Sequence, residues 1–185
     1  PFGDGDLGTP GAVNPPCSEV LRVGQLGVGD LVVTEIMASP AAGEEGEWVE
    51  IYNAAALAVD LGGLVLSDGS GSFTVPLGVL VSPGDFVVLG QSEQGSDNGG
   101  APVDVAYGDA IRWGAADTVM LTASGLVVDE VEYDATFGGE DGASLSLRPN
   151  RLDASDNDTG QNWCTSTSSF GAGDLGTPGT DNDAC

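Results

Sequence analysis

Short runs in which apolar and polar residues alternate recur along the middle of this chain, at a spacing of roughly ten residues. Clusters of Gly, Pro, Asp and Ser separate these runs, and no convincing apolar stripe of helical period is present. Alternation with a period of two is typical of strands that bury one face. The pattern therefore predicts an all-β sandwich with almost no helix. The expected strands are 30–37, 47–53, 60–68, 71–76, 85–90, 117–122, 126–133 and 143–148.

Alternation also assigns side chains to the two faces of a strand. In strand 47–53 we expect Val49 and Ile51 to face the core and Trp48, on the opposite face, to cover a sheet edge. In strand 30–37 alternation places Val33, Glu35 and Met37 on one face and Val32, Thr34 and Ile36 on the other.

Composition separates a central region from two flanking segments, and the repeat described below divides the N-terminal flank at residue 17. The expected strands lie within residues 30–150, which we predict to form the sandwich. The flanking segments are long and rich in Gly, Pro, Asn, Asp, Ser and Thr, so we expect irregular N- and C-terminal tails. In this division residues 18–29 are a linker and residues 151–185 are a C-terminal extension.

The two ends of the chain are near copies of each other. Residues 2–17 read FGDGDLGTPGAVNPPC and residues 170–185 read FGAGDLGTPGTDNDAC, so 11 of 16 positions are identical at an offset of 168. Agreement of this kind indicates one period of a tandem array. Residues 1–17 are then predicted to be a linker that copies the C-terminal tail of the preceding unit.

The repeat also explains an odd number of cysteines. Cys164 and Cys185 fall within one unit, so we predict that they form a disulfide. The corresponding partner of Cys17 would precede the chain, so we predict that Cys17 bonds to a neighbouring unit. Disulfides form in oxidising compartments, which favours an extracellular or cell-surface protein. The alternative is three reduced, buried thiols in a cytosolic protein.

The charge of the chain excludes several classes of function. The net charge is −25, with four arginines, no lysine and no histidine. So acidic a chain is a poor partner for nucleic acid and is repelled by anionic membranes. No apolar run of membrane-spanning length is present, so we expect no membrane insertion. Acidic surfaces also keep proteins soluble, which alone could explain the charge.

Few residues are suited to catalysis. Without histidine, Ser-His-Asp and Cys-His arrangements are impossible. Glu35 and Glu50 could form a carboxylate pair if their strands are neighbours, but solvated or metal-bound carboxylates are the simpler interpretation. We therefore expect that the protein is not an enzyme.

One polar loop could bind a metal ion. Asp153, Asp156 and Asp158 place three carboxylates within six residues, and Asn157 and Thr159 add further oxygen atoms. Calcium prefers such ligands, so we predict a calcium site here as the only cofactor, with an ordinary polar turn as the alternative. A weaker cluster comprises Glu44, Glu45 and Glu47. The sequence Asn157-Asp158-Thr159 is also an N-glycosylation sequon.

An ordered series of short motifs resembles the lamin-tail domain, an immunoglobulin-like module. The series consists of Glu35-Ile36, Val49-Glu50-Ile51-Tyr52-Asn53, Asp60-Leu61-Gly62-Gly63, Pro83-Gly84 and Gly125. Residues 143–148, 162–163 and 176–179 are similar to the C-terminal extension of bacterial members. The resemblance implies an immunoglobulin-like β-sandwich and a binding or structural role, in an exported protein.

We therefore predict a non-catalytic extracellular structural module that repeats or self-assembles in a cell-surface fibre or stalk. The alternatives are a calcium-dependent adhesion or carbohydrate-binding module, and an appendage of an exported hydrolase. The expected partner is the protein itself, head-to-tail through residues 1–17, which would add to a sheet edge of a neighbouring unit. In a further alternative, these residues fold back on their own domain.

Overall fold

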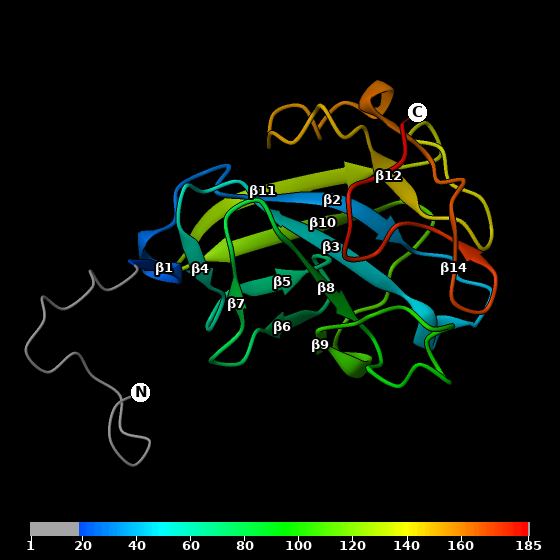
Figure 1. The fold of residues 1–185 in the computed structure, drawn as a ribbon, viewed down its shortest axis with the longest axis horizontal. Coiled ribbons are helices and arrows are strands. Elements are labelled where there is room, and N and C mark those ends of the chain that lie inside the picture. The colour runs from blue at the N-terminus through cyan, green and yellow to red at the C-terminus, as the bar shows by residue number, and fades with distance from the viewer. Residues whose placement is uncertain (1–18, 185) are drawn as a thin grey trace, which may run out of the picture.

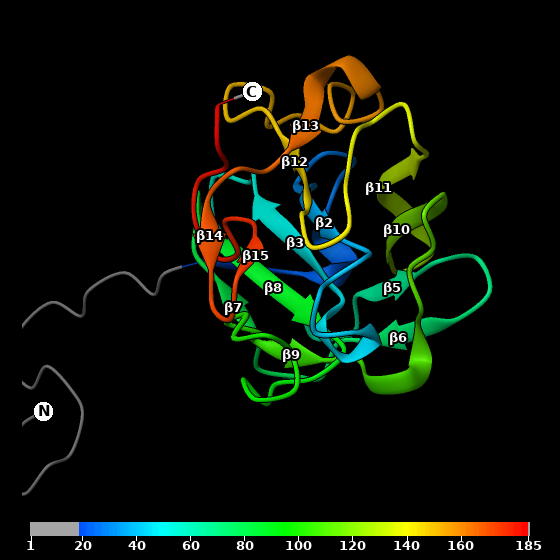
Figure 2. The same cartoon turned by 90° about the vertical axis from the view of Figure 1, so that its right-hand side faces the viewer.

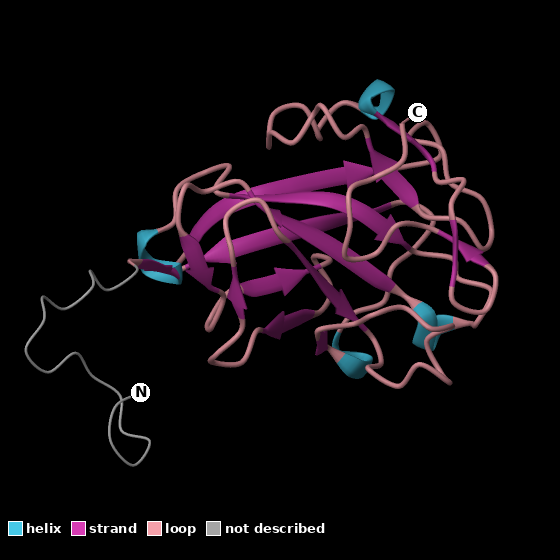
Figure 3. Cartoon of the chain, viewed as in Figure 1, coloured by secondary structure: helices cyan, strands magenta, loops and turns pink. Residues whose placement is uncertain are grey.

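The computed structural model describes residues 19–184 and shows an all-β protein (Figure 1). Four short 3₁₀ turns are the helical elements of these residues, and Figure 3 shows how little of the fold they make up. The turns are η1 (Val23–Gln25), η2 (Glu44–Gly46), η3 (Gly108–Ala110) and η4 (Gly160–Asn162). The strands are β1 (Val20–Arg22), β2 (Leu31–Met37), β3 (Trp48–Asn53), β4 (Ala58–Asp60), β5 (Val65–Ser67), β6 (Ser72–Thr74), β7 (Leu80–Val81), β8 (Phe86–Gly90), β9 (Val105–Ala106), β10 (Asp117–Ala123), β11 (Leu126–Tyr133), β12 (Leu145–Leu147), β13 (Trp163–Thr165), β14 (Ser169–Phe170) and β15 (Asp174–Leu175).

Two sheets form the sandwich. One has the strand order β13-β12-β2-β3-β8-β9 and the other has the order β11-β10-β5-β6. Two smaller sheets, β1-β4-β7 and β14-β15, lie beside them. Across residues 19–184 no helix is both long and apolar enough to cross a membrane.

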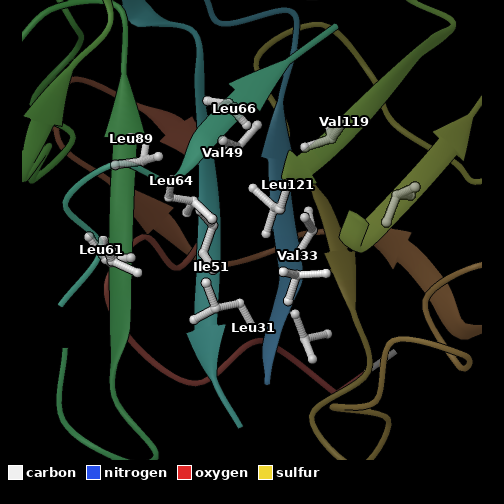
Figure 4. Close-up of a cluster of buried hydrophobic side chains, with 14 of the residues drawn as sticks. Leu31, Val33, Val49, Ile51, Leu61, Leu64, Leu66, Leu89, Val119 and Leu121 are labelled. Atoms are coloured by element: carbon white, nitrogen blue, oxygen red, sulfur yellow. The ribbon is translucent and has the colours of Figure 1, made fainter. Parts of the chain in front are cut away.

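The core lies between the two larger sheets. Val49 and Ile51 of β3 point toward Leu66 of β5 and Leu121 of β10 (Figure 4), and all four side chains are fully buried. The prediction that Val49 and Ile51 face the core is therefore confirmed. Burial of apolar surface at about 25 cal/mol per Å² makes this cluster the main stabilising element of the sandwich.

A β-bulge in β2 changes which of its side chains face the core. The pairing of β2 with β3 shifts between Val33 and Glu35, so Val33 and Ile36 both enter the core cluster. The expected strict alternation, with Val33, Glu35 and Met37 on one face, is wrong. A bulge inserts one extra residue, here Thr34, and the faces exchange beyond it.

The outer face of the six-stranded sheet is also covered. Trp48 lies on this face, in an interior strand, and is fully buried with Met37 and Val88. We expected Trp48 to cover a sheet edge, and that expectation is wrong. Alternation cannot distinguish a face that meets solvent from one that a distant segment covers.

Strand boundaries differ from the expectation where turns are tight. The range 60–68 is two strands, β4 and β5, because Leu64 N donates to Leu61 O at 2.8 Å and closes a turn. Gly63 in this turn has φ of +96°, a conformation that favours glycine. The residues 18–29, expected to be a linker, contain β1, which pairs in parallel with β4. Strands as short as β1 leave too little alternation to detect.

Asn53 fixes the turn that follows β3. Its side chain is fully buried, and its Nδ2 donates to Leu57 O at 3.1 Å and Val81 O at 3.0 Å. Its Oδ1 accepts from Ala55 N at 3.0 Å. The asparagine that closes the Val-Glu-Ile-Tyr-Asn motif therefore has a structural role.

We expect Asn53→Ala to lower the free energy of unfolding by about 1–3 kcal/mol, because buried backbone groups lose their partners. Urea denaturation measures the change. The control is Asn162→Ala, which removes one 2.8 Å bond from a partly exposed asparagine and should cost less. Equal losses in the two variants would contradict this role of Asn53.

Candidate functional site

Two glutamates lie side by side on the outer face of the six-stranded sheet. Glu35 of β2 and Glu50 of β3 are cross-strand partners, and both side chains are fully buried. The neighbouring strands that a carboxylate pair requires are therefore present. The bulge at Thr34 is what turns Glu35 to the same face as Glu50.

Glu35 is surrounded by donors. Its Oε1 accepts from Ser144 Oγ, from Ser146 Oγ at 2.9 Å and from Thr177 N at 3.0 Å. Its Oε2 accepts from Thr177 Oγ1 at 3.0 Å. Ser146 lies in β12 and Ser144 directly precedes this strand, whereas Thr177 lies in the C-terminal segment.

Glu50 has fewer partners. Its Oε1 accepts from Thr34 Oγ1 at 2.8 Å, and its Oε2 accepts from Gly179 N at 2.7 Å. The C-terminal segment therefore donates to both glutamates. The described arginine ion pairs involve other carboxylates, at Asp60, Glu44, Asp109 and Asp156.

Burial without a cation raises the pKa of both glutamates. Desolvation is the main cause for Glu35, and its hydrogen bonds partly offset it. Desolvation also raises the pKa of Glu50 well above its ordinary value, and the nearby charge of Glu35 raises it further. Glu50 accepts fewer hydrogen bonds than Glu35, so less offsets the effect of its burial.

The segment 170–182, called here the tail segment, covers this face of the sheet. Figure 2 shows β14, β15 and the residues after them on the side of β3 and β8 away from β5 and β10. The ring of Phe170 packs edge-on against Trp48, with centroids 6.0 Å apart. Together with Met37, Val88 and Ala101 these rings form a second apolar cluster.

Further contacts hold the tail segment along its length. Asp174 accepts from Ala41 N at 2.9 Å. Leu175 pairs beside Ala143: its N donates to Gly142 O at 2.8 Å and its O accepts from Ser144 N at 2.9 Å.

Asn182 anchors the far end of the tail segment. Its Nδ2 donates to Thr34 O at 2.7 Å and to Leu147 O at 2.8 Å. We call the surface that receives the tail segment the seat. It comprises Thr34, Glu35, Trp48, Glu50, Ala41, Gly99, Gly142, Ser144 and Leu147.

This geometry does not provide a catalytic cleft at Glu35 and Glu50. Both carboxylates are fully buried, and Thr177 and Gly179 fill their hydrogen-bonding positions. The arrangement is suited to holding a polypeptide segment against the sheet. Sequence reasoning identified the two glutamates but missed Thr177, Gly179 and Asn182, although the repeated GDLGTPG segment contains the first two.

The side chains predicted to bind calcium make other contacts in the structure. Asp153 Oδ1 accepts from Ser155 N at 2.9 Å and closes a turn, and Asp156 pairs with Arg151 at 3.5 Å. Within residues 19–184 no group of three acidic or cysteine side chains is arranged to hold a metal ion. Calcium binding by Asp153, Asp156 and Asp158 stays a prediction from the sequence.

Asn157, predicted to add an oxygen atom to the calcium site and to lie in a glycosylation sequon, is a buried structural residue. It is fully buried, and its Nδ2 donates to Asp129 Oδ2 at 2.7 Å, while its carbonyl accepts from Trp163 Nε1 at 2.7 Å. Asp129 also accepts from Val33 N at 2.7 Å, and burial raises the pKa of Asp129 to about 6. A side chain enclosed in this way is not accessible for glycosylation in the folded chain.

The second acidic cluster is likewise divided. Glu47 is buried and accepts from Trp113 N at 3.0 Å, and burial raises the pKa of Glu47. Glu44 is exposed and pairs with Arg112 at 3.4 Å. Glu47 therefore forms a buried hydrogen bond, whereas Glu44 forms an exposed ion pair, and the two do not act as one cluster.

Cys164 lies in β13 and is disulfide-bonded. Cys17 and Cys185 both lie outside the described residues, so the pairing of Cys164 with Cys185 stays a prediction. The segment between Cys164 and Cys185 contains the whole tail segment. A disulfide here would limit how far the tail segment can move from the seat.

We expect peptide mapping of the unreduced protein to recover Cys164 linked to Cys185. Reduction should lower the free energy of unfolding by about 3 kcal/mol in the chain-entropy model for a loop of this size. The control is the reduced digest, in which the two peptides should separate. Recovery of both as free thiols in oxidised protein would contradict the pairing.

Comparison with known families identifies the sandwich. The model of the family described as Lamin Tail Domain matches residues 25–135. The match covers β2 to β11, which include the whole four-stranded sheet and four strands of the six-stranded sheet, and it ends before β12, β13 and the tail segment. A search of curated proteins finds no match.

Proposed function

We propose that this chain, which belongs to the lamin tail domain family, is a non-catalytic extracellular structural module that repeats along a cell-surface fibre or stalk. One observation carries the proposal. The segment that is duplicated at offset 168 is the same segment that docks on the sandwich and covers its buried glutamates. A repeat whose period ends in its own docking segment is suited to a linear array.

The proposal is also supported by the surface and the cysteines. A net charge of −25 favours solubility and disfavours binding to nucleic acid. The disulfide at Cys164 favours an oxidising compartment, outside the cytosol. The buried position of Glu35 and Glu50 disfavours hydrolysis by this pair.

Localisation tests the proposal directly. Antibodies raised against residues 19–184 should label intact cells of the source organism, and immunogold electron microscopy should place the label on filaments or stalks. External protease should remove the signal, while a cytosolic marker protein should be unaffected. A signal that is protected from protease until the cells are lysed would contradict an extracellular role.

A further inference from the structure

We propose that the seat is a docking site between copies of this protein, and that its second occupant is residues 2–14 of another copy. This inference rests on the proposed function in treating the chain as a repeating unit. It goes beyond that function by assigning the partner, the surface and the contacts. The tail segment 170–182 fills the seat within one chain and shows which chemistry an occupant needs.

The side chains that hold the tail segment recur in the N-terminal copy. Phe2 corresponds to Phe170, Asp6 to Asp174, Thr9 to Thr177 and Asn14 to Asn182. These tail residues pack on Trp48 and bond to Ala41 N, Glu35 and Thr34 O, respectively. The N-terminal copy therefore has all four anchoring side chains at the same spacing.

The glycines recur for steric reasons. Gly171 lies so close to Gly99 that an added Cβ would be 2.0 Å from the Gly99 carbonyl oxygen, and Ala172 N donates to that oxygen at 2.7 Å. Gly179 has φ of +83° while its N–H donates to Glu50. Gly3 and Gly11 stand at the corresponding positions of the copy.

The positions that differ between the two copies are mostly those that do not face the seat. Ala172, Thr180, Asp181 and Ala184 are exposed and are replaced in the N-terminal copy. Identity is therefore kept where an occupant touches the seat and lost where it faces solvent. This is the pattern expected of two ligands for one site.

The chemistry of the seat requires an occupant of this kind. Two buried carboxylates and the carbonyls of Thr34 and Leu147 all accept hydrogen bonds from the tail segment. Without donors these groups would be left unsatisfied or would take up water, at a cost in free energy. Residues 2–14 contain the same donors, on Thr9, Gly11 and Asn14.

One difference gives the tail segment priority in its own chain. Asp183 accepts from Ser168 Oγ at 2.7 Å and from Thr167 N at 3.0 Å, and these bonds lower the pKa of Asp183 to about 2. Pro15 stands at the corresponding position and has no carboxylate. The tail segment is also tethered, with a local concentration in the millimolar range, so another copy competes only at a comparable concentration or when this segment is weakened.

Sedimentation velocity on full-length chains tests the inference. Phe170→Ala combined with Asn182→Ala weakens the tail segment and leaves the seat intact. We expect this tail variant to self-associate with an apparent Kd about tenfold lower than that of the wild type. Adding Thr9→Val and Asn14→Ala should return it to the monomer, because these changes remove the side-chain donors that correspond to Thr177 Oγ1 and Asn182 Nδ2.

A matched control uses the positions that differ between the copies. Asp4→Ala with Val13→Asp, which installs the residues found in the tail segment, should leave association of the tail variant unchanged. A folded tail variant that stays monomeric would overturn the inference. Association that persists after Thr9→Val and Asn14→Ala would also overturn it.

A second measurement applies if the tail variant does not fold. A peptide of residues 1–16 is titrated to about millimolar concentration into the wild type, and NMR signals of the Trp48 indole and the Glu50 amide are followed. We expect both to shift, and the Thr9→Val, Asn14→Ala peptide to leave them unchanged. Equal effects of the two peptides, or none, would overturn docking. If the peptides fail this test but antibodies label the cell surface, the docking inference is wrong and the proposed function is still supported. If docking is observed but the protein is found in the cytosol, the proposed function is wrong and the docking inference stands.

Discussion

Trp48→Ala is expected to lower the free energy of unfolding by about 3–5 kcal/mol, the largest loss that we expect from a single substitution. The side chain is fully buried in an interior strand, between the sheet and Phe170 of the tail segment. Alanine would leave a cavity under the tail segment and remove its main apolar contact. Urea denaturation followed by circular dichroism measures the change.

Trp48→Phe is the matched control. It retains an aromatic ring and removes Trp48 Nε1, a buried donor that has no partner among the described residues. We therefore expect it to lose much less stability than Trp48→Ala. If Trp48→Ala costs under about 1 kcal/mol, as an exposed position would, the outer face is not buried as the structure shows.

Moderate acid is expected to stabilise the fold. Burial raises the pKa of Glu35 and Glu50 above the ordinary value of 4.5, and raises that of Asp129 to about 6. At pH values between the ordinary pKa of these carboxyl groups and their raised pKa in the folded protein, the native state binds more protons than the unfolded state. Its stability therefore rises as the pH falls from 7.5 to about 5, by about 1.4 kcal/mol for each unit of pKa shift.

More strongly acidic conditions should reverse this trend. Hydrogen bonds from Ser168 and Thr167 lower the pKa of Asp183 to about 2. At Asp68 desolvation is the largest single effect and raises the pKa, but the hydrogen bonds from Gly71 and Ser70 together lower it. As the pH falls below about 4, Asp183 and Asp68 become protonated in the unfolded state before they do so in the native state. The stability that these two carboxylates contribute is therefore lost. Stability should therefore be highest near pH 5.

Glu50→Gln tests the source of the acid effect. Glutamine is neutral and similar in shape, so the variant should lose much of the rise in stability between pH 7.5 and 5. Glu130→Gln, at an exposed position of β11, is the control and should keep the wild-type slope. A variant Glu50→Gln whose pH dependence matches the wild type would show that the raised pKa of Glu50 is not a source of the acid effect.

Much of the sandwich could be predicted from the sequence. The strand 126–133 and the core side chains Val49 and Ile51 are where alternation places them, because long strands with one buried face carry a clear period of two. Short strands such as β1 and β9 contain too few residues for a period. The bulge at Thr34 was missed because one inserted residue leaves no local compositional signal.

The candidate site was predictable only in part. Glu35 and Glu50 were recognised as a possible pair, and the repeat drew attention to 170–185. Their contact was not predicted, because Thr177 and Glu35 are brought together by the tertiary fold and not by local periodicity. Gly-rich and Asp-rich composition indicated an irregular tail but not what it binds, because backbone donors such as those of Thr177 and Gly179, which the buried carboxylates require, leave no mark on the sequence.

Amide hydrogen exchange at Thr177 and Gly179 tests the central claim, that the tail segment docks on the buried glutamates, most directly. Both N–H groups donate to these carboxylates, at 3.0 Å and 2.7 Å. Docking predicts that both amides exchange slowly in the wild type, with protection close to that of Glu50 in β3, and faster in Glu50→Gln. Exchange of both amides at the rates of an unstructured peptide, while the amides of β3 stay protected, would contradict docking of the tail segment on the sheet.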